Sequence, residues 1–368
     1  MAEETLPEPL SITLRNVKQH RELTVDLSGR MIVLVGPNGV GKSTVLKAMY
    51  ALGALSRAAA IWRFEEALAG SLLMREESID RPTRLEVIQA WRGDPGAQST
   101  IEVRFGAGAA VVRLEDEPSP LAITIPGDDA QLDQSALQVG AQRRATSAFL
   151  RSLRATYLQP EFSALSRASP VSSTQMGPRG ENLASSVAEL ILRYQETHVA
   201  VESGLRKIIP ALTRMGAKQV RLVEPKSLGD GFELELRFGD ARVVGHAVSE
   251  GTLIALAVLT LVHRSPGVRF ILLDDVDRGL HPTAQRALID QLRGVLKARP
   301  ELKIICTTHS PYIVSNFEPS EVRVLGRNKT TGDTVCKRLD QHPKIDEYKR
   351  FLDAGEYWAS VGEDWVGE

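Results

Sequence analysis

The sequence predicts an α/β fold with a mainly parallel sheet, joined to an antiparallel β subdomain and a helical subdomain. An apolar run at 31–35 is followed by a glycine-rich loop and by helical apolar spacing up to residue 52. Short alternating runs between about 84 and 125 indicate an antiparallel meander. From residue 268 onward, apolar strands alternate with helical patterns, which is typical of parallel strands covered by helices.

The composition is that of a globular protein. Hydrophobic residues make up 43% of the 368 residues, enough for one large domain or two ordinary ones. The formal net charge of −1 gives no overall attraction to nucleic acid or anionic membranes, so such contacts would need a local patch. The longest mainly apolar run, 253–262, is too short to span a bilayer, and the N-terminus lacks an apolar signal core. We therefore expect a cytoplasmic protein with no membrane partner.

Residues 36–44, Gly-Pro-Asn-Gly-Val-Gly-Lys-Ser-Thr, fit the phosphate-loop pattern G-x-x-x-x-G-K-[ST] between a strand and a helix. The glycines let successive backbone N–H groups face a phosphate chain at the helix N-terminus. Lys42 is expected to reach the β- and γ-phosphates, and Ser43 to place its hydroxyl on Mg²⁺. The predicted ligands are ATP and Mg²⁺. The residues predicted to bind the nucleotide here are Gly36, Asn38, Gly39, Gly41, Lys42, Ser43 and Thr44.

Polar residues follow two apolar strands in the last third of the chain. Asp274 ends the strand at 269–273, where ligands of open α/β sheets bind, and is expected to hold Mg²⁺. Asp275 is expected to orient or deprotonate the attacking water. His309 follows the strand at 302–306 and is placed to hydrogen-bond a γ-phosphate. Alone, the two acids would also fit a capped loop, and the histidine an ordinary loop position.

A short polar turn, Ser249-Glu250-Gly251-Thr252, precedes a helix predicted over 253–262. Free N–H groups at a helix N-terminus, together with the Ser249 hydroxyl, form an anion site. A simple capping turn would explain the same residues. A second phosphate-binding helix end is, however, what a dimer needs in order to close around ATP from the opposite side.

Three other segments each keep two interpretations. The helical pattern at 142–154 carries Arg143, Arg144, Arg151 and Arg154, which form either a nucleic-acid contact or, more commonly, a solvated face. The polar connection at 15–20 places Lys18 or His20 near the nucleotide or in a solvated hairpin. The C-terminal segment 356–365 holds two of the four tryptophans, which either fold back onto the chain's own core or dock a partner protein.

In this order, the motifs resemble those of the ATP-binding-cassette (ABC) class of ATPases. They are the loop at 36–44, the turn at 249–252, Leu-Leu-Asp-Asp-Val-Asp-Arg-Gly-Leu-His-Pro at 272–282 and Thr-Thr-His-Ser-Pro at 307–311. More closely, they resemble the branch with the SMC and RecF proteins and the OLD family, which includes AAA family ATPases of phage-defence type. Gly-Glu-Asn-Leu at 180–183 also resembles that branch.

The resemblance implies an ABC-type P-loop NTPase head that hydrolyses ATP. By this resemblance, Ser249 and Gly251 belong to the signature that caps the γ-phosphate in the opposite subunit of a homodimer. Gln159 is implied as the Q-loop residue near Mg²⁺, and His309 as the switch histidine. The expected organisation is a first ATPase lobe at 1–160, a Q-loop linker with helical subdomain and hairpin at 161–247, a second lobe at 248–340 and a helical tail at 341–368.

Three departures from the family patterns shape the functional expectation. Asp275 stands where the family usually has Glu, and its shorter arm leaves the carboxylate further from the water, so we expect slow or regulated hydrolysis. The signature lacks the Leu and paired glycines of transporter cassettes, which speaks against a membrane transporter. Because about sixty residues follow His309, we expect no TOPRIM nuclease domain of the kind that OLD nucleases carry.

The leading hypothesis is an antiviral-defence regulator that closes as a nucleotide-sandwich homodimer and controls a separately encoded nuclease or toxin effector. The alternative is a RecF-type DNA-repair or chromosome-maintenance ATPase that clamps DNA. A third hypothesis is a scaffold that binds ATP without turnover. The sequence does not decide whether the chain forms higher oligomers or whether it binds a nucleic acid.

Overall fold

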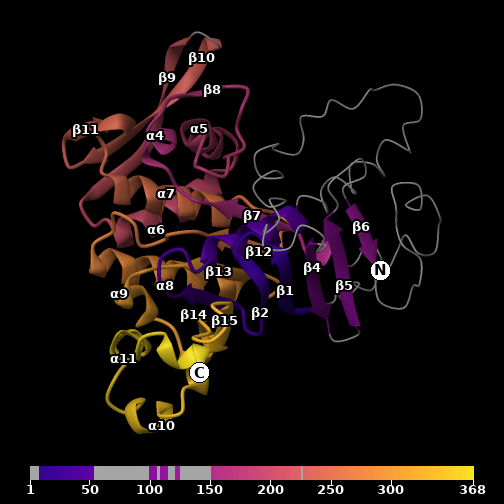
Figure 1. The fold of residues 1–368 in the computed structure, drawn as a ribbon. Coiled ribbons are helices and arrows are strands. Elements are labelled where there is room, and N and C mark those ends of the chain that lie inside the picture. The colour runs from indigo at the N-terminus through magenta and orange to yellow at the C-terminus, as the bar shows by residue number, and fades with distance from the viewer. Residues whose placement is uncertain (1–7, 54–98, 106–107, 115–120, 125–150, 225–226) are drawn as a thin grey trace. The chain divides into compact units, whose positions relative to one another are not determined.

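The computed structural model describes residues 8–53, 99–105, 108–114, 121–124, 151–224 and 227–368. Its contacts divide the chain into two compact units. Unit 1 comprises Met1–Thr156, Val268–Phe270 and Phe317–Glu368, and unit 2 comprises Tyr157–Gly267 and Ile271–Asn316. Figure 1 labels the elements of both units. No helix in the described part of the chain has the length and apolar character that a membrane crossing requires.

Unit 1 contains an antiparallel sheet with strand order β2-β1-β4-β5-β6 (Figure 1). The strands are β1 (Pro9–Val17), β2 (His20–Asp26), β4 (Ser99–Phe105), β5 (Gly108–Leu114) and β6 (Leu121–Thr124). In β4 every second residue is buried, because alternate side chains of a strand point to opposite faces and one face covers the core. The antiparallel subdomain is therefore confirmed from β4 onward. The part of the predicted meander before residue 99 lies outside the described residues.

The phosphate-loop strand of unit 1 pairs with a strand nearly three hundred residues later in the chain. β3 (Met31–Val35) lies parallel to β14 (Val322–Arg327), which in turn pairs antiparallel with β15 (Thr334–Arg338). All five residues of β3 are buried, as expected for a strand covered on both faces. The chain leaves β3 through the glycine loop and is helical over residues 42–53.

The carboxyl ends of β7 (Ala155–Leu158) and β12 (Phe270–Leu273) belong to unit 2. β13 (Lys303–Thr307) also belongs to this unit and lies next to β12 in the sheet. α7 (Glu250–His263) precedes β12, α8 (Pro282–Ala298) lies between β12 and β13 in the chain, and α9 (Pro311–Val314) follows β13. Residues 251–262 of α7 are all buried, because this helix is apolar on every side. Pro282 at the first turn starts α8, since proline fits a position that needs no backbone N–H.

A second sheet of unit 2 carries the predicted hairpin. β9 (Leu212–Glu224) pairs with β10 (Ser227–Phe238), which also pairs with β11 (Ala241–Val244) and β8 (Ser169–Pro170). The helical elements here are α4 (Phe162–Leu165), α5 (Leu183–Arg193), α6 (Gln195–Ile208) and the 3-10 turn η3 (Gly245–Ala247). α5 packs on β9 and β10, whereas α6 packs on α7 and α8. The mixed α/β class with a mainly parallel sheet, antiparallel sheets and helices is thus confirmed.

The C-terminal segment is part of unit 1 and packs on β14 and β15. Its elements are η4 (Pro319–Glu321), η5 (Leu339–Gln341), α10 (Ile345–Tyr348), α11 (Ala354–Val361) and η6 (Asp364–Gly367). Trp358 is 8% exposed, and half-buried Trp365 donates its indole N–H to the carbonyl oxygen of Gly362 at 3.1 Å. The first of the two interpretations of the tail therefore holds, and Trp358 is part of the core instead of an offered docking residue.

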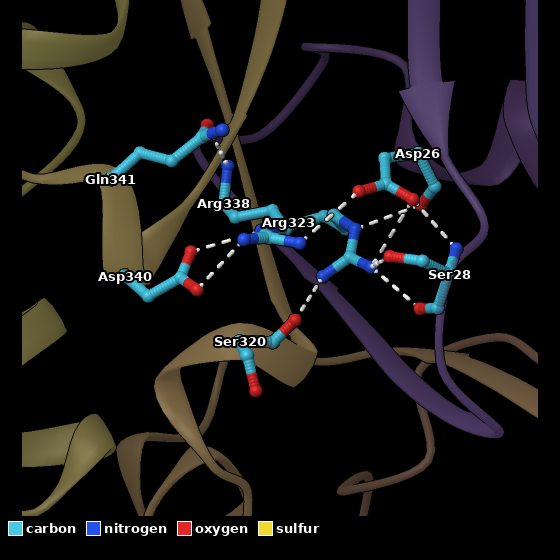
Figure 2. A network of polar contacts seen from close by, with 7 residues as sticks. All are labelled: Asp26, Ser28, Ser320, Arg323, Arg338, Asp340 and Gln341. Atoms are coloured by element: carbon cyan, nitrogen blue, oxygen red, sulfur yellow. Dashed lines mark hydrogen bonds and ion pairs between the residues drawn. The ribbon is translucent and has the colours of Figure 1, made fainter.

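A buried arginine joins three segments of unit 1 (Figure 2). Arg323 in β14 is fully buried and donates hydrogen bonds to the carbonyl oxygens of Asp26 at 2.8 Å, Ser28 at 2.8 Å and Ser320 at 2.6 Å. One Asp26 carboxylate oxygen lies 3.7 Å from the guanidinium. Burial lowers the pKa of Arg323, although a guanidinium stays charged at neutral pH. This charge holds the end of β2, η4 and β14 together.

We expect Arg323→Met to lower the free energy of unfolding by about 3 kcal/mol, because three carbonyl oxygens would lose the donor that a fully buried side chain supplies. Urea unfolding measures this loss. The matched control is Arg338→Met: the Arg338 side chain is 34% exposed and pairs with Asp340 at 3.0 Å, so we expect about 1 kcal/mol or less. Equal losses in the two variants would contradict the role given to Arg323.

Candidate phosphate-loop and acidic sites

The glycines of the predicted phosphate loop have backbone conformations that favour glycine, and two of them leave no room for a Cβ. Gly36, Gly39 and Gly41 have φ angles of 142°, 72° and 102°, in the left-handed region that favours glycine. A Cβ on Gly36 would lie 2.3 Å from the carbonyl oxygen of Leu325. A Cβ on Gly41 would lie 2.3 Å from side-chain atoms of Gln19 and His20. The loop therefore approaches its neighbours with bare backbone.

Lys42 lies over the loop that precedes it. Its ammonium donates to the carbonyl oxygens of Gly36 at 2.9 Å and Pro37 at 3.2 Å, and the residue is 6% exposed. Ser43, next in the chain, is half-buried at the start of the helix, whereas Asn38 and Gly39 are exposed at the loop tip. The loop thus presents one buried positive charge and a helix N-terminus, the combination that binds phosphate groups.

The connection between β1 and β2 packs against the loop from behind. His20 is fully buried, and its Nε2 lies 3.3 Å from the carbonyl oxygen of Gly41, to which it donates. Burial lowers the pKa of His20 to about 4; the hydrogen bond to Gly41 opposes this shift and the charge of Arg327 adds to it. The imidazole is therefore neutral near pH 7. The solvated-hairpin interpretation is wrong for His20.

In unit 2, the carboxylate of Asp274 is held by two hydroxyl groups. Asp274 is fully buried at the end of β12; one oxygen accepts from the Thr307 hydroxyl at 2.5 Å and the other from the Tyr157 hydroxyl at 2.9 Å. The Tyr157 hydroxyl also lies 3.2 Å from the side-chain oxygen assigned to Gln159. Tyr157 therefore brings Gln159 and Asp274 together.

Asp275 has a backbone conformation that is uncommon for a residue with a side chain. Its φ angle is 52°, and its backbone N–H donates to the Thr307 hydroxyl at 2.8 Å. Such positive φ angles cost energy and tend to occur where function requires a fixed direction. One hydroxyl, that of Thr307 in β13, thus fixes both adjacent acids.

His309 and the signature turn also lie in unit 2. His309 is exposed, and its backbone N–H lies 3.4 Å from a carboxylate oxygen of Asp277, which also accepts from the Thr308 hydroxyl at 2.6 Å. Ser249 precedes α7, but its hydroxyl bonds to Thr252 at 2.8 Å and caps no backbone N–H. Ser249 is thus the N-cap residue of α7 by position, although its side chain forms no capping hydrogen bond.

Gly251 brings the signature turn against the loop that follows the two acids. A Cβ on Gly251 would lie 2.1 Å from the carbonyl oxygen of Gly279, so only glycine permits this approach. Beside it, Glu250 and Arg278 approach to 3.0 Å. The turn and the loop after Asp275 are thus in contact within one unit.

The donor set predicted for Mg²⁺ suits that ion chemically. The Ser43 hydroxyl, the Asp274 carboxylate and the Gln159 amide all offer oxygen, and Mg²⁺ is commonly held by one or two carboxylates together with substrate phosphates. The described residues contain no group of three or more His, Cys, Asp or Glu side chains that could hold a metal ion. Ser43 lies in unit 1, whereas Asp274 and Gln159 lie in unit 2.

Sequence reasoning missed Tyr157 and Thr307. Both lie at the carboxyl ends of strands that flank β12. A hydroxyl residue at that edge of each neighbouring strand was the available signal. Of the four arginines at 142–154, Arg143 and Arg144 lie outside the described residues, and Arg151 and Arg154 are half-buried.

Two sequence-family models match the chain. One, described as "AAA domain, putative AbiEii toxin, Type IV TA system", matches residues 138–315, and another, described as "AAA domain", matches residues 11–59. Between them they include the phosphate loop, the signature turn, the two acids and His309. No curated protein matches the chain.

Solved SMC heads are similar to this chain in fold. The crystal structure of an SmcHead bound to the C-winged helix domain of ScpA gives a TM-score of 0.56 at 16% identity, covering 92% of this chain and 100% of that one. An Smc head domain with an extended coiled coil, bound to the C-terminal domain of ScpA derived from Pyrococcus furiosus, gives 0.54 at 14% identity, covering 94% and 100%.

The buried position of His20 predicts a pH-dependent stability. An unfolded histidine has a pKa near 6.5, so between pH 6.5 and 4 the unfolded state binds more protons, and the free energy of unfolding falls as the pH falls. The full effect is about 3 kcal/mol. His20→Gln removes this titration, so its stability relative to wild type should improve as the pH is lowered. Urea unfolding from pH 7 to 4 measures it, and a constant difference would contradict the prediction.

Proposed function

We propose a function that starts from the class of the chain, an ABC-class AAA ATPase of the SMC/RecF type, which the family matches and the shared fold support. We infer that the chain binds Mg²⁺-ATP, hydrolyses it slowly and closes as a nucleotide-sandwich homodimer. The observation that carries the proposal is the phosphate loop, in which the buried Lys42 ammonium lies over a backbone that leaves no room for a Cβ at Gly36 or Gly41.

Each predicted site residue has a role in this proposal. The loop N–H groups and Lys42 bind the phosphates, and Ser43, Asp274 and Gln159 supply oxygen to Mg²⁺. When bound, Mg²⁺ neutralises charge on the β- and γ-phosphates. Asp275 orients the attacking water, in a backbone conformation fixed by Thr307. Its carboxylate reaches less far than that of Glu, which favours slow turnover.

A second copy of the chain would complete the site. Ser249 is exposed at the start of α7, next to the backbone N–H groups of the first helical turn. We infer that Ser249 and Gly251 of one copy cap the γ-phosphate bound by the other, with His309 as the switch residue near that phosphate. ATP would then join two copies, and hydrolysis would release them.

The cellular role that we propose is regulation of an antiviral defence system in the cytoplasm, through a separately encoded nuclease or toxin. The description of the family model over residues 138–315 names a toxin of a toxin–antitoxin system, which supports a defence context. α5 and α6 are only 11 and 14 residues long and are joined at Tyr194. The helices within residues 183–208 are thus short.

We expect Lys42→Ala to reduce Mg²⁺-ATP affinity at least a hundredfold while the far-UV circular dichroism spectrum stays unchanged, because the loop loses its only lysine. Calorimetry measures the affinity, and Lys47→Ala, a half-buried lysine further along the same helix, is the control. In a phage challenge of cells that also carry the neighbouring genes, Lys42→Ala should abolish protection. Unchanged ATP affinity would refute the ATPase assignment; absence of protection by the wild type would refute only the defence role.

The alternative, a RecF-type ATPase that clamps DNA, is favoured by one observation in unit 2. Arg237 in β10 pairs with Arg214 in β9 and with Arg242 in β11, so three arginines stand in one row across the sheet. The opposite face contains the buried residues Met215 and Leu236, which places the row on the outer face. Like charges directly across a sheet destabilise it, and phosphate groups of a nucleic acid would relieve that repulsion.

The two roles can be separated by DNA binding. If the chain clamps DNA, replacing Arg214, Arg237 and Arg242 by Gln should weaken duplex binding at least tenfold and reduce its salt dependence, while ATP affinity stays unchanged. Fluorescence anisotropy in 50 to 200 mM salt measures both quantities. Arg193→Gln, an exposed arginine at the end of α5, is the control. No duplex binding by the wild type would remove this alternative.

A further inference from the structure

Tyr157 lies between two residues expected to hold Mg²⁺, and sequence motifs gave it no role. It is 6% exposed near the end of β7. Its hydroxyl oxygen lies 2.9 Å from a carboxylate oxygen of Asp274 and 3.2 Å from the atom assigned as the side-chain oxygen of Gln159. All three residues belong to unit 2. The Tyr157 hydroxyl must therefore form a hydrogen bond with Asp274 and another with Gln159.

The number of protons on these groups fixes the direction of the hydrogen bonds. A tyrosine hydroxyl has one proton to donate, and an ionised carboxylate only accepts. The proton therefore goes to Asp274, at the shorter distance. The Tyr157 oxygen must then accept from Gln159, so the amide nitrogen of Gln159 has to face it. Amide oxygen and nitrogen are assigned from such networks, and this network turns the Gln159 amide over.

The turned amide has a consequence for metal binding. With its nitrogen bound to Tyr157, the Gln159 amide directs its oxygen away from the tyrosine, where it is available as a ligand. On the other side of the site, the Thr307 hydroxyl holds the second oxygen of Asp274 at 2.5 Å. Each carboxylate oxygen accepts more than one contact, so Asp274 keeps capacity for a metal while its orientation is fixed.

We propose that Tyr157 is a positioning residue: it accepts from Gln159 and donates to Asp274, and so fixes two oxygen ligands for the Mg²⁺ of the nucleotide site. This inference rests on the proposed function. Partners that orient metal ligands typically contribute 10- to 100-fold to metal affinity. Because Thr307 still holds Asp274, we expect the lower end of that range. The alternative is that the hydroxyl serves only the packing of β7.

The test is Tyr157→Phe in the full chain, which keeps the ring and removes the hydroxyl. The affinity for Mn²⁺ is titrated by electron paramagnetic resonance at a saturating concentration of a non-hydrolysable ATP analogue. We expect it to fall about tenfold, whereas affinity for the metal-free analogue changes less than twofold. Tyr312→Phe, whose residue is 59% exposed in the same unit, is the control and should behave as wild type.

A double-mutant cycle distinguishes positioning from packing. If Tyr157 acts through Gln159, the loss caused by Tyr157→Phe should shrink to about threefold or less in a Gln159→Ala background, because the amide is already absent. Wild-type Mn²⁺ affinity in Tyr157→Phe, or the same tenfold loss in both backgrounds, would overturn the proposal. Failure of wild type to bind nucleotide with metal would instead overturn the proposed function, and this assignment with it.

Discussion

The structure of unit 1 depends on the close enclosure of a bare-backbone loop. Leu325 of β14 reaches the backbone at Gly36, and His20 of β2 reaches it at Gly41. From β15, the Thr334 hydroxyl donates to the carbonyl oxygen of Val40 at 3.3 Å. The loop is thus held by strands from both ends of the sequence. Unit 1 accordingly joins the N-terminal strands to residues 317–368, and buried Arg323 adds hydrogen bonds between the same two parts of the sequence.

In unit 2, Asp274 and Asp275 are held by side-chain hydroxyl groups, whereas the phosphate loop of unit 1 is held by contacts to its backbone. A buried carboxyl group needs hydrogen-bond partners, and Asp274 receives them from Tyr157 and Thr307. The same Thr307 hydroxyl accepts from the N–H of Asp275 and stabilises its left-handed backbone. A fixed carboxylate beside a strained acid suits a site that must hold a metal and direct a water molecule.

The sequence predicted those parts of the molecule in which a local residue pattern is compatible with only one backbone conformation. The glycine spacing at 36–41 determined the phosphate loop, because only such a backbone tolerates contacts as close as that to Leu325. Tyr157 and Thr307 were not predictable from local pattern, since their role depends on which strands lie beside β12. Whether the Trp358 side chain is buried likewise depends on the residues that surround it in the fold, and the local sequence does not show them.

We propose that ATP joins two copies of this chain, and the mass of the complex tests this proposal most directly. Asp275→Asn should bind ATP without hydrolysing it, because the amide cannot act as a base for the attacking water. Light scattering should then show a monomer without nucleotide and a dimer with Mg²⁺-ATP. Adding Ser249→Arg should keep ATP bound but prevent the dimer. A chain of unchanged mass at full ATP occupancy would contradict the account.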